Sequence, residues 1–218
     1  MSVAIVVVSR GPRRAKSRLR GALTSAARER LAGAMLDDVL HAATATGWPV
    51  LVVTDARSTA VRARAAGART LVAPARGTRD GARRGLRRVE REGAGAALVI
   101  AADVPLVKPV DLRRVVAAGR RSEIVIVPDR RRTGTNALYL RPPSRIAPQF
   151  GARSFAAHRR AAGAGGRVLK IARLGLDIDT PADLDTLRRA RRRAGAGTRA
   201  ALTAATTGRA SGPGRSRA

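Results

Sequence analysis

Short apolar runs recur along the chain and alternate with segments in which apolar residues return every three or four positions. The runs at 3–8 and 97–101 are almost uninterrupted in hydrophobic residues. Such continuity is typical of strands that are buried on both faces, as in a mainly parallel sheet. Shorter runs predict further strands at 50–54, 70–72, 124–127, 137–140 and 168–171.

Helical spacing fills the gaps between these runs. Between the first two predicted strands, apolar residues recur at helical spacing from Leu31 to Ala42, which predicts a long helix packed on the sheet. Similar patterns predict helices near 59–66, 80–92, 110–118, 154–162 and 181–193. The alternation of strand and helix predicts an α/β fold built on a single doubly wound, mainly parallel sheet.

The length of 218 residues suits one such domain, which we expect to occupy residues 1–193. From residue 194 onward the chain is rich in Gly, Ala, Ser and Arg and no apolar period survives. We therefore expect residues 194–218 to form a disordered basic tail. The apolar opening is too short to span a membrane and no basic region precedes it, so a cytoplasmic protein without a membrane partner is expected.

Charge and cysteine content narrow the function classes. The formal net charge is +29, from 44 basic and 15 acidic residues, and such a balance favours polyanionic partners. The arginines are spread along the chain, however, and aromatic residues make up only 2% of it, so we expect no specific nucleic-acid partner. The absence of cysteine excludes thiolate catalysis and zinc–cysteine sites.

Acidic residues at two places are candidate metal ligands. Asp103 follows the predicted strand at 97–101, where a metal ligand and a turn aspartate are equally good interpretations. Asp177 and Asp179 alternate in an extended segment, so they point to one side, and neither is needed for the helix cap that Thr180 offers. Because Mg²⁺ prefers carboxylate oxygens, these three acids predict a shared magnesium site.

A basic, glycine-containing loop follows the first predicted strand. It includes Arg10, Gly11 and Lys16, and it lies at the carboxyl end of the strand, where open α/β sheets bind ligands. Clustered cations and loop amides can hold a triphosphate there. A solvated basic loop is the alternative interpretation.

Two later segments offer donors to an anion. The Thr-Gly-Thr-Asn sequence at 133–136 combines small hydroxyl groups with backbone amides around a glycine. Gly151 and Ser154 stand at the start of a predicted helix, where exposed amides attract anions. For Ser154 alone, a plain N-cap is the simpler interpretation. Neither His41 nor His158 is expected to be a catalyst.

Taken together and in order, six motifs resemble those of the 2-phospho-L-lactate guanylyltransferases, a family that includes the bacterial phosphoenolpyruvate guanylyltransferases. The motifs are Ala-Lys-Ser-Arg-Leu at 15–19, Ala-Asp-Val-Pro-Leu at 102–106, Pro-Asp-Arg at 128–130, Thr-Gly-Thr-Asn-Ala-Leu at 133–138, Phe-Gly-x-x-Ser-Phe-x-x-His at 150–158 and Leu-Asp-Ile-Asp-Thr-Pro-Ala-Asp-Leu at 176–184. The resemblance covers roughly residues 1–190. Its second motif is common to many nucleotidyltransferases, whereas the fourth and fifth in this order are specific.

The resemblance implies a sheet of the nucleotide-diphospho-sugar transferase (Rossmann-like) type. It implies a Mg²⁺-dependent transfer of GMP from GTP to phosphoenolpyruvate or 2-phospho-L-lactate, with release of diphosphate, in coenzyme F-420 biosynthesis. By motif position, Lys16 and Asp103 become catalytic candidates, with Lys16 on the triphosphate. The acceptor-phosphate contacts become Thr133, Gly134, Thr135, Asn136, Gly151 and Ser154, and the metal ligands Asp103, Asp177 and Asp179.

The chain departs from the family pattern in two places. It reads Val8-Ser9-Arg10 where Pro-Val-Lys is usual. It also carries Arg79 and Asp80 where family members show an asparagine linked to base recognition. A carboxylate can accept from the guanine N1–H and its exocyclic amine, so we expect GTP to remain the preferred donor.

Several alternatives stay open at this stage. The acceptor could instead be 3-phospho-D-glycerate, a sugar phosphate or a molybdopterin. From another class, the chain could be an inactive derivative that binds nucleic acid through its basic charge. An oligomer is possible.

Overall fold

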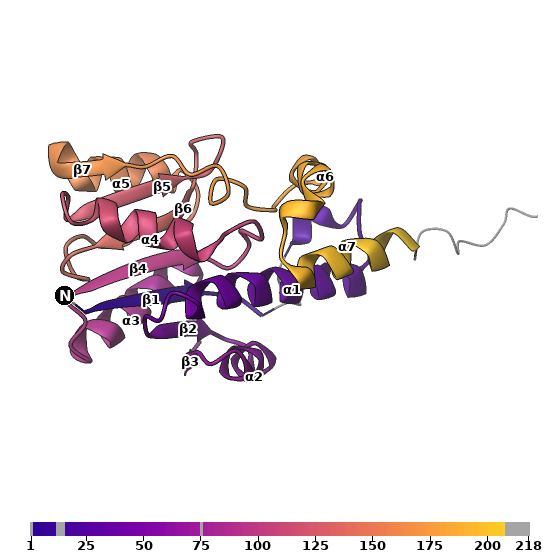
Figure 1. Cartoon of the computed structure of the whole chain (residues 1–218), viewed down its shortest axis with the longest axis horizontal. Coiled ribbons are helices and arrows are strands. Elements are labelled where there is room, and N and C mark those ends of the chain that lie inside the picture. The colour runs from indigo at the N-terminus through magenta and orange to yellow at the C-terminus, as the bar shows by residue number, and fades with distance from the viewer. Residues whose placement is uncertain (1, 12–15, 75, 208–218) are drawn as a thin grey trace, which may run out of the picture.

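The computed structural model describes residues 2–11, 16–74 and 76–207; the middle of the predicted basic loop and residues 208–218 lie outside this part. Seven strands form one sheet in the order β3-β2-β1-β4-β6-β5-β7 (Figure 1). They are β1 (Val3–Val8), β2 (Val50–Thr54), β3 (Arg69–Val72), β4 (Ala96–Ala101), β5 (Ile124–Pro128), β6 (Thr135–Leu140) and β7 (Gly166–Val168).

Strand β6 is the reversed member of this sheet. It pairs antiparallel with β4 and β5, whereas the other neighbouring strands pair in parallel. The predicted mainly parallel α/β sheet is therefore confirmed. Because β6 runs the opposite way, its first residue, Thr135, lies at the edge where β1, β4 and β5 end. The sheet edge at the carboxyl ends of the parallel strands therefore also carries the first residues of β6.

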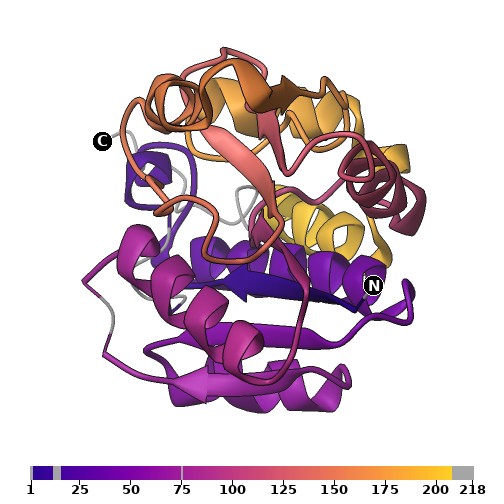
Figure 2. The same ribbon diagram turned by 90° about the vertical axis from the view of Figure 1, so that its left-hand side faces the viewer.

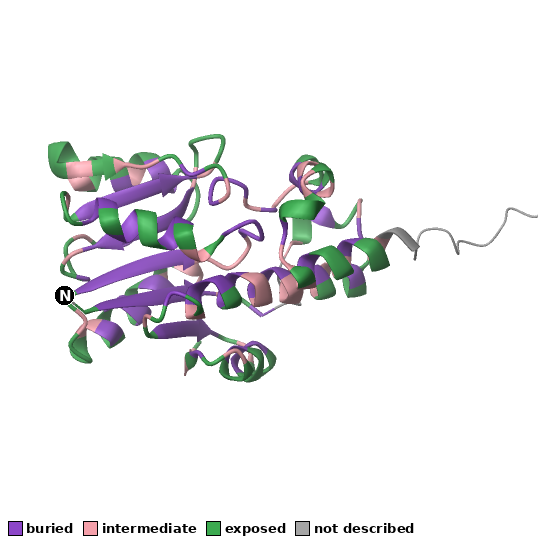
Figure 3. Ribbon diagram, viewed as in Figure 1, coloured by how far each residue is buried: buried purple, intermediate pink, exposed green. Residues whose placement is uncertain are grey.

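Helices cover both faces of the sheet (Figure 2). On one face α1 (Ser25–Thr44), α2 (Arg57–Ala65) and α4 (Pro109–Ala118) pack on inward side chains such as Ile5 and Val7. On the other face lie α3 (Thr78–Arg91) and α5 (Ser154–Ala162). The inner strands between them are buried (Figure 3), as their continuous hydrophobic runs predict, whereas the edge strands β3 and β7 are partly exposed.

Local sequence explains how these helices start and how closely they pack. The Thr24 side chain accepts from the Ala27 amide, which caps α1. Gly81 and Gly85 on α3 face Val8 and Val6, and an added Cβ at either glycine would clash with the valine. These glycines let α3 approach the sheet closely.

A third apolar cluster lies beyond the end of the sheet, and we call it the outer cluster. It joins η2 (Ser17–Leu19), the first half of α1, α6 (Pro181–Arg189) and α7 (Ala196–Thr207) (Figure 1). Its buried members include Leu19, Leu23, Leu31, Met35, Leu106, Leu176, Ile178, Leu184, Leu187 and Leu202. Asp177 and Asp179 flank Ile178, a buried member of this cluster, and precede α6.

The end of the chain differs from the sequence-based expectation. Residues 196–207, expected to be disordered, form helix α7, which packs along α1 with Leu202 buried. The Thr198 amide donates to Asp38 Oδ2 at 3.1 Å. Alanine favours helix intrinsically. The small side chains of α7 let its backbone lie close to α1, so the two helices pack although α7 has few large apolar residues. The expectation overlooked this kind of packing.

The last predicted strand is also shifted. The strand expected at 168–171 lies at Gly166–Val168 and pairs with β5. Leu169 still donates to the Ile126 carbonyl, but Ile171 has already turned into the core. The predicted helix at 181–193 ends at Arg189, and a 3-10 turn, η4, follows over Arg191–Arg193. Within the described residues, no helix is long and apolar enough to cross a membrane.

Candidate active site

A cleft of about 620 Å³ opens at the edge where the parallel strands end. Segments far apart in sequence line it: the end of β1, the end of β4, the start of β6, the start of α5 and the segment before α6. The sequence-predicted residues that it brings together are Arg10, Lys16, Asp103, Thr133, Gly134, Thr135, Asn136, Gly151, Ser154, Asp177 and Asp179. The ligand-binding edge expected for an open α/β sheet is thus where these residues meet.

One end of the cleft, the carboxylate end, consists of Lys16, Asp103, Asp177 and Asp179. Lys16 Nζ lies 2.9 Å from Asp179 Oδ1 and forms a short ion pair with Asp103. Its side chain is only 6% exposed. Burial works to lower the pKa of Lys16, but the two carboxylates outweigh it and hold the pKa above its ordinary value. Lys16 is therefore a charged ammonium shared by two acids.

Asp177 sits behind this pair. Burial first, and then the charges of Asp103 and Asp179, raise its pKa to about 6, although the hydrogen bond from Asn136 acts to lower it. That bond runs from Asn136 Nδ2 to Asp177 Oδ1 at 3.1 Å, while the same amide nitrogen also donates to the Leu174 carbonyl at 2.8 Å. Asn136, predicted to contact the acceptor phosphate, thus holds an acid of the carboxylate end.

The carboxylate end fits a divalent cation through its donor chemistry. In the described ranges no three His, Cys, Asp or Glu side chains converge closely enough to hold a metal by themselves. Asp103 and Asp179 nevertheless converge on one cation, the Lys16 ammonium. Mg²⁺ commonly takes one or two carboxylates and completes its shell with phosphate and water, so this pair meets its requirement.

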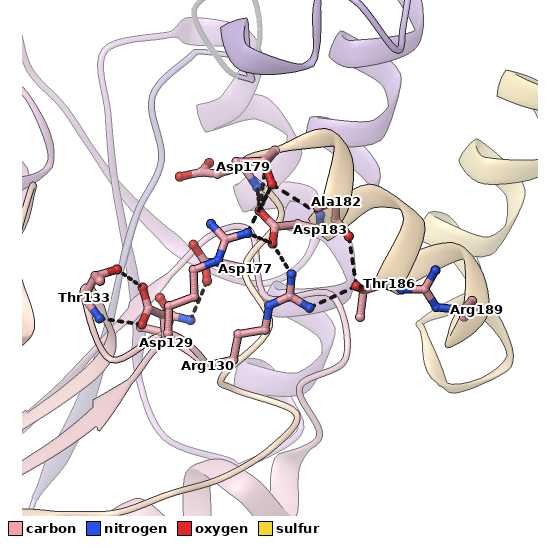
Figure 4. Close-up of polar contacts among 12 residues, drawn as sticks. Asp129, Arg130, Thr133, Asp177, Asp179, Ala182, Asp183, Thr186 and Arg189 are labelled. Carbon is pink, nitrogen blue, oxygen red and sulfur yellow. Dashed lines mark hydrogen bonds and ion pairs between the residues drawn. The ribbon is translucent and has the colours of Figure 1, made fainter.

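The third acid of the 176–184 segment, Asp183, has a structural role. Thr180 and Asp183 form the capping box of α6, with Pro181 at the helix start. Arg130 reaches Asp183 Oδ1 at 2.6 Å (Figure 4), and Arg131 reaches the same oxygen at 3.2 Å. The prediction that Thr180 and Asp183 cap α6, without the side chains of Asp177 and Asp179, is confirmed.

Asp129 organises the Thr-Gly-Thr-Asn turn. Its carboxylate accepts from the Thr133 amide and the Thr133 hydroxyl, each at 2.8 Å (Figure 4). It also accepts from the Gly134 amide at 2.8 Å. The amides that were predicted to receive a phosphate therefore already hold an internal carboxylate. Asp129 follows β5 and precedes Thr133 by four residues. This position is typical of an aspartate that binds nearby backbone amides, but the sequence analysis did not predict the role of Asp129.

A second part of the cleft, the hydroxyl end, consists of Thr135 and Ser154, and the buried His158 lies behind them. The Thr135 amide donates to Ser154 Oγ at 2.9 Å, and both side chains are almost fully buried. Ser154 is not the N-cap of α5, because Arg153 holds that position and makes no side-chain cap bond. The simpler interpretation of Ser154 as a plain cap is wrong. Gly151, with φ of 129°, shapes the exposed loop before this helix.

The residues predicted to read the nucleotide are distributed differently. The Gly11 amide donates to Asp55 Oδ1 at 3.0 Å, so this amide stabilises the loop that follows β1. Asp80 is held by Arg83 and Arg84, each at 2.9 Å, and hydrogen bonds from Arg84 and then Arg83 lower its pKa to about 2. The structure brings neither Arg79 nor Asp80 into the cleft lining, where α3 contributes Thr78 instead.

Comparison with known proteins gives this site a context. A family model described as "Guanylyl transferase CofC like" matches residues 2–189. The chain belongs to the CofC-like guanylyl transferase family. The resemblance seen in the sequence motifs is thereby confirmed, and it extends over the whole sheet and both ends of the cleft.

Relatives of this CofC-like chain cover nearly the same length. The phosphoenolpyruvate guanylyltransferase of Sphaerobacter thermophilus is 39% identical over 191 residues, which are 85% of this chain and 92% of the relative. The 2-phospho-L-lactate guanylyltransferase of Halorubrum lacusprofundi is 37% identical over 187 residues, with 84% and 82% covered. A solved Desulfovibrio desulfuricans protein described as a nucleotide-diphospho-sugar transferase superposes with a TM-score of 0.75 at 15% identity, with 95% and 96% covered, and confirms the fold type.

Proposed function

We propose that this chain transfers GMP from GTP to the phosphate of phosphoenolpyruvate or 2-phospho-L-lactate, releasing diphosphate in coenzyme F-420 biosynthesis in the cytoplasm. The observation that carries the proposal is the two-ended cleft of a CofC-like chain. One end gathers an ammonium and three carboxylates, and the other presents two buried hydroxyl groups. A triphosphate with its cation suits the first end, and an anionic acceptor suits the second.

Catalysis here rests on position and charge. The acceptor's phosphate oxygen attacks the α-phosphorus and forms a new P–O bond, while the bond from that phosphorus to the bridging oxygen breaks. Diphosphate leaves with the electron pair, so no protein nucleophile is required. Lys16 and Arg10 neutralise the triphosphate, and Thr135 and Ser154 hold the acceptor in line.

A divalent cation belongs to this proposal. Asp103 and Asp179, with Asp177 behind them, would hold Mg²⁺, which neutralises charge on the triphosphate and on the leaving diphosphate. Lys16 would then release at least one of its two carboxylates and turn its ammonium toward the phosphates. We also propose GTP as the donor, because the relatives are named guanylyltransferases, although neither Arg79 nor Asp80 lines the cleft.

The decisive experiment is diphosphate release from GTP with Mg²⁺ and each of three acceptors: phosphoenolpyruvate, 2-phospho-L-lactate and 3-phospho-D-glycerate. We expect release with one of the first two, with the GMP-linked product identified by mass spectrometry. ATP, CTP and UTP in competition test the base. Absence of release with every acceptor would overturn the proposal, whereas equal use of ATP would remove only the guanylyl assignment.

A further inference from the structure

A buried histidine stands directly behind the hydroxyl end. His158 is 0% exposed and lies one turn after Ser154 on α5, so both side chains share a helix face. Its ring contacts Thr135 on β6 through Nδ1 and the Gln149 amide through Nε2. The Phe150 ring packs edge-on against it at 5.1 Å. One imidazole thus joins β6, α5 and the loop before α5.

The Gln149 amide fixes which ring nitrogen carries the hydrogen. Its N–H lies 2.7 Å from Nε2 and can only donate, so Nε2 is unprotonated. Burial, and secondarily the charge of Arg79, lowers the pKa of His158 to about 4, which keeps the ring neutral at physiological pH. The single hydrogen is then on Nδ1, 2.9 Å from Thr135 Oγ1, and the imidazole donates to the threonine oxygen.

The direction of the hydrogen bond from His158 to Thr135 determines whether the hydroxyl groups act as donors toward the cleft. Thr135 Oγ1 accepts from His158, and Ser154 Oγ accepts from the Thr135 amide. Within the part of the chain that the structure describes, neither hydroxyl hydrogen has an acceptor of its own. Both residues line the cleft, so both hydrogens are available to a bound anion.

We propose that His158 is a positioning residue that turns the Thr135 hydroxyl into a hydrogen-bond donor, so that Thr135 and Ser154 form an uncharged two-donor site for the acceptor's phosphate. The inference rests on the proposed function for the identity of that phosphate. Reversing the His158–Thr135 bond would direct the hydroxyl hydrogen away from the anion and an oxygen lone pair toward it. The two hydroxyl groups are neutral donors to the anion, next to Arg153, which also lines the cleft.

Substitutions that separate donor from acceptor at this position test the proposal. In His158→Asn an amide N–H can replace Nδ1–H, whereas His158→Leu removes the donor and Thr135→Val removes the hydroxyl. We expect His158→Leu and Thr135→Val each to raise KM for phosphoenolpyruvate by about tenfold and to leave KM for GTP within about twofold. His158→Asn should stay within about threefold of the parent protein for both substrates.

The double variant His158→Leu/Thr135→Val distinguishes positioning from general support. If His158 acts through the Thr135 hydroxyl, the double variant binds phosphoenolpyruvate as Thr135→Val alone does. Multiplied effects, or equal losses for GTP and phosphoenolpyruvate, would overturn the proposal. If His158→Leu does not fold, calorimetric affinity for phosphoenolpyruvate in His158→Asn and Thr135→Val decides: a loss only in Thr135→Val supports the proposal, and a loss in neither or in both overturns it.

The ring can also be observed without turnover. The chain has two histidines, so the imidazole ¹⁵N spectrum holds two sets of signals, and a His41→Asn variant assigns them. We expect His158 to show a protonated Nδ1 and a bare Nε2 from pH 5.5 to 8. A protonated Nε2, or titration near pH 6.5, would overturn the proposal. If this tautomer and the calorimetric result hold while no acceptor supports diphosphate release, the proposed function fails and the anion site stands.

Discussion

The two ends of the cleft are built on opposite electrostatic principles. At the carboxylate end, three acids crowd together, one of them has its pKa raised to about 6, and a buried ammonium bridges the other two. At the hydroxyl end, a neutral imidazole, two hydroxyl groups and backbone amides satisfy one another in sequence. The first end is held together by a cation, the Lys16 ammonium, whereas the second carries no formal charge and keeps two hydroxyl hydrogens for an anion. Substitutions should therefore affect charge neutralisation at one end and affinity at the other.

The largest effect is expected at Asp103. Asp103→Asn keeps the shape of the side chain but removes a charge from the cation site, so diphosphate release should fall by about 10²–10³-fold or more. Asp185→Asn, an exposed acid on α6 paired with Arg188, is the matched control and should retain activity. Turnover near that of the parent protein in Asp103→Asn would remove this acid from the mechanism and break the comparison.

A smaller effect, of a different kind, is expected at Ser154. Ser154→Ala removes one of the two donors and leaves the Thr135 amide without its acceptor, so KM for the acceptor should rise by about 10-fold while KM for GTP is unchanged. Ser144→Ala, which removes a hydroxyl bonded to Glu90 outside the cleft lining, serves as control. If kcat fell while KM for the acceptor stayed the same, Ser154 would contribute to the chemical step and not to acceptor binding.

Removing α7 tests how much this helix stabilises the outer cluster. A chain ending at residue 194 exposes the α1 surface that Leu202 covers, at a cost of roughly 2–3 kcal/mol, or a fall in Tm of about 5–10 °C. A chain ending at residue 207 is the control, because the Gly-, Ser- and Arg-rich sequence beyond it has no apolar pattern, and its Tm should not change. Equal Tm values for all three chains would show that α7 packs without stabilising.

Stability against pH should show the two ends opposing each other in the metal-free protein. The folded pKa of His158, about 4, lies below its ordinary 6.5, so its contribution is lost as pH falls from 6.5 toward 4. The folded pKa of Asp177, about 6, lies above its ordinary 3.8, so its contribution grows as pH falls through 6. Each slope is on the order of 1 kcal/mol per pH unit.

Single variants separate these two slopes. In urea unfolding with a chelator present, Asp177→Asn should lose stability between pH 6 and pH 5 faster than the parent protein. His158→Asn should lose less than the parent or gain. Parallel curves for the three proteins would show that neither pKa shift is present.

The smallest effect is expected at Asp80. Its carboxylate is committed to Arg83 and Arg84 on the surface of α3, so Asp80→Ala should leave the preference for GTP over ATP within about twofold of the parent value. Competition between the two nucleotides measures this. If selectivity disappeared in the variant, Asp80 would become a base-reading residue and the nucleotide pocket would extend along α3.

Local patterns predicted most of the fold and the location of the site. Continuous apolar runs marked the strands, and the rule that ligands bind where parallel strands end placed Asp103 and the β1 loop at one edge. The partners of Lys16 could not be predicted in this way, because Asp103 and Asp179 lie 87 and 163 residues away in sequence. Asp129 illustrates the same limit at short range, since a turn that offers amides to a phosphate offers them equally to a nearby carboxylate.

Helix α7 shows a second limit. Periodicity detects helices that bury large apolar residues, and α7 buries Leu202 among alanine, threonine and glycine. Its packing depends on close approach to α1 and on the Asp38 contact to Thr198. Neither feature leaves a periodic pattern in the sequence.

The groups that line the cleft are held by two parts of the molecule, the outer cluster and the sheet. Lys16 precedes Leu19 and Asp179 precedes Leu184, and both leucines belong to the outer cluster, whereas Thr135 and Ser154 are anchored in the sheet and α5. The bond from Asn136 to Asp177 connects the two parts. The relative position of donor and acceptor then depends on how the outer cluster packs against the sheet, so we expect substitutions in that packing that touch neither substrate to change the rate. Hydrogen exchange would detect this if amides near Leu19 and Leu184 opened together, separately from those of the sheet.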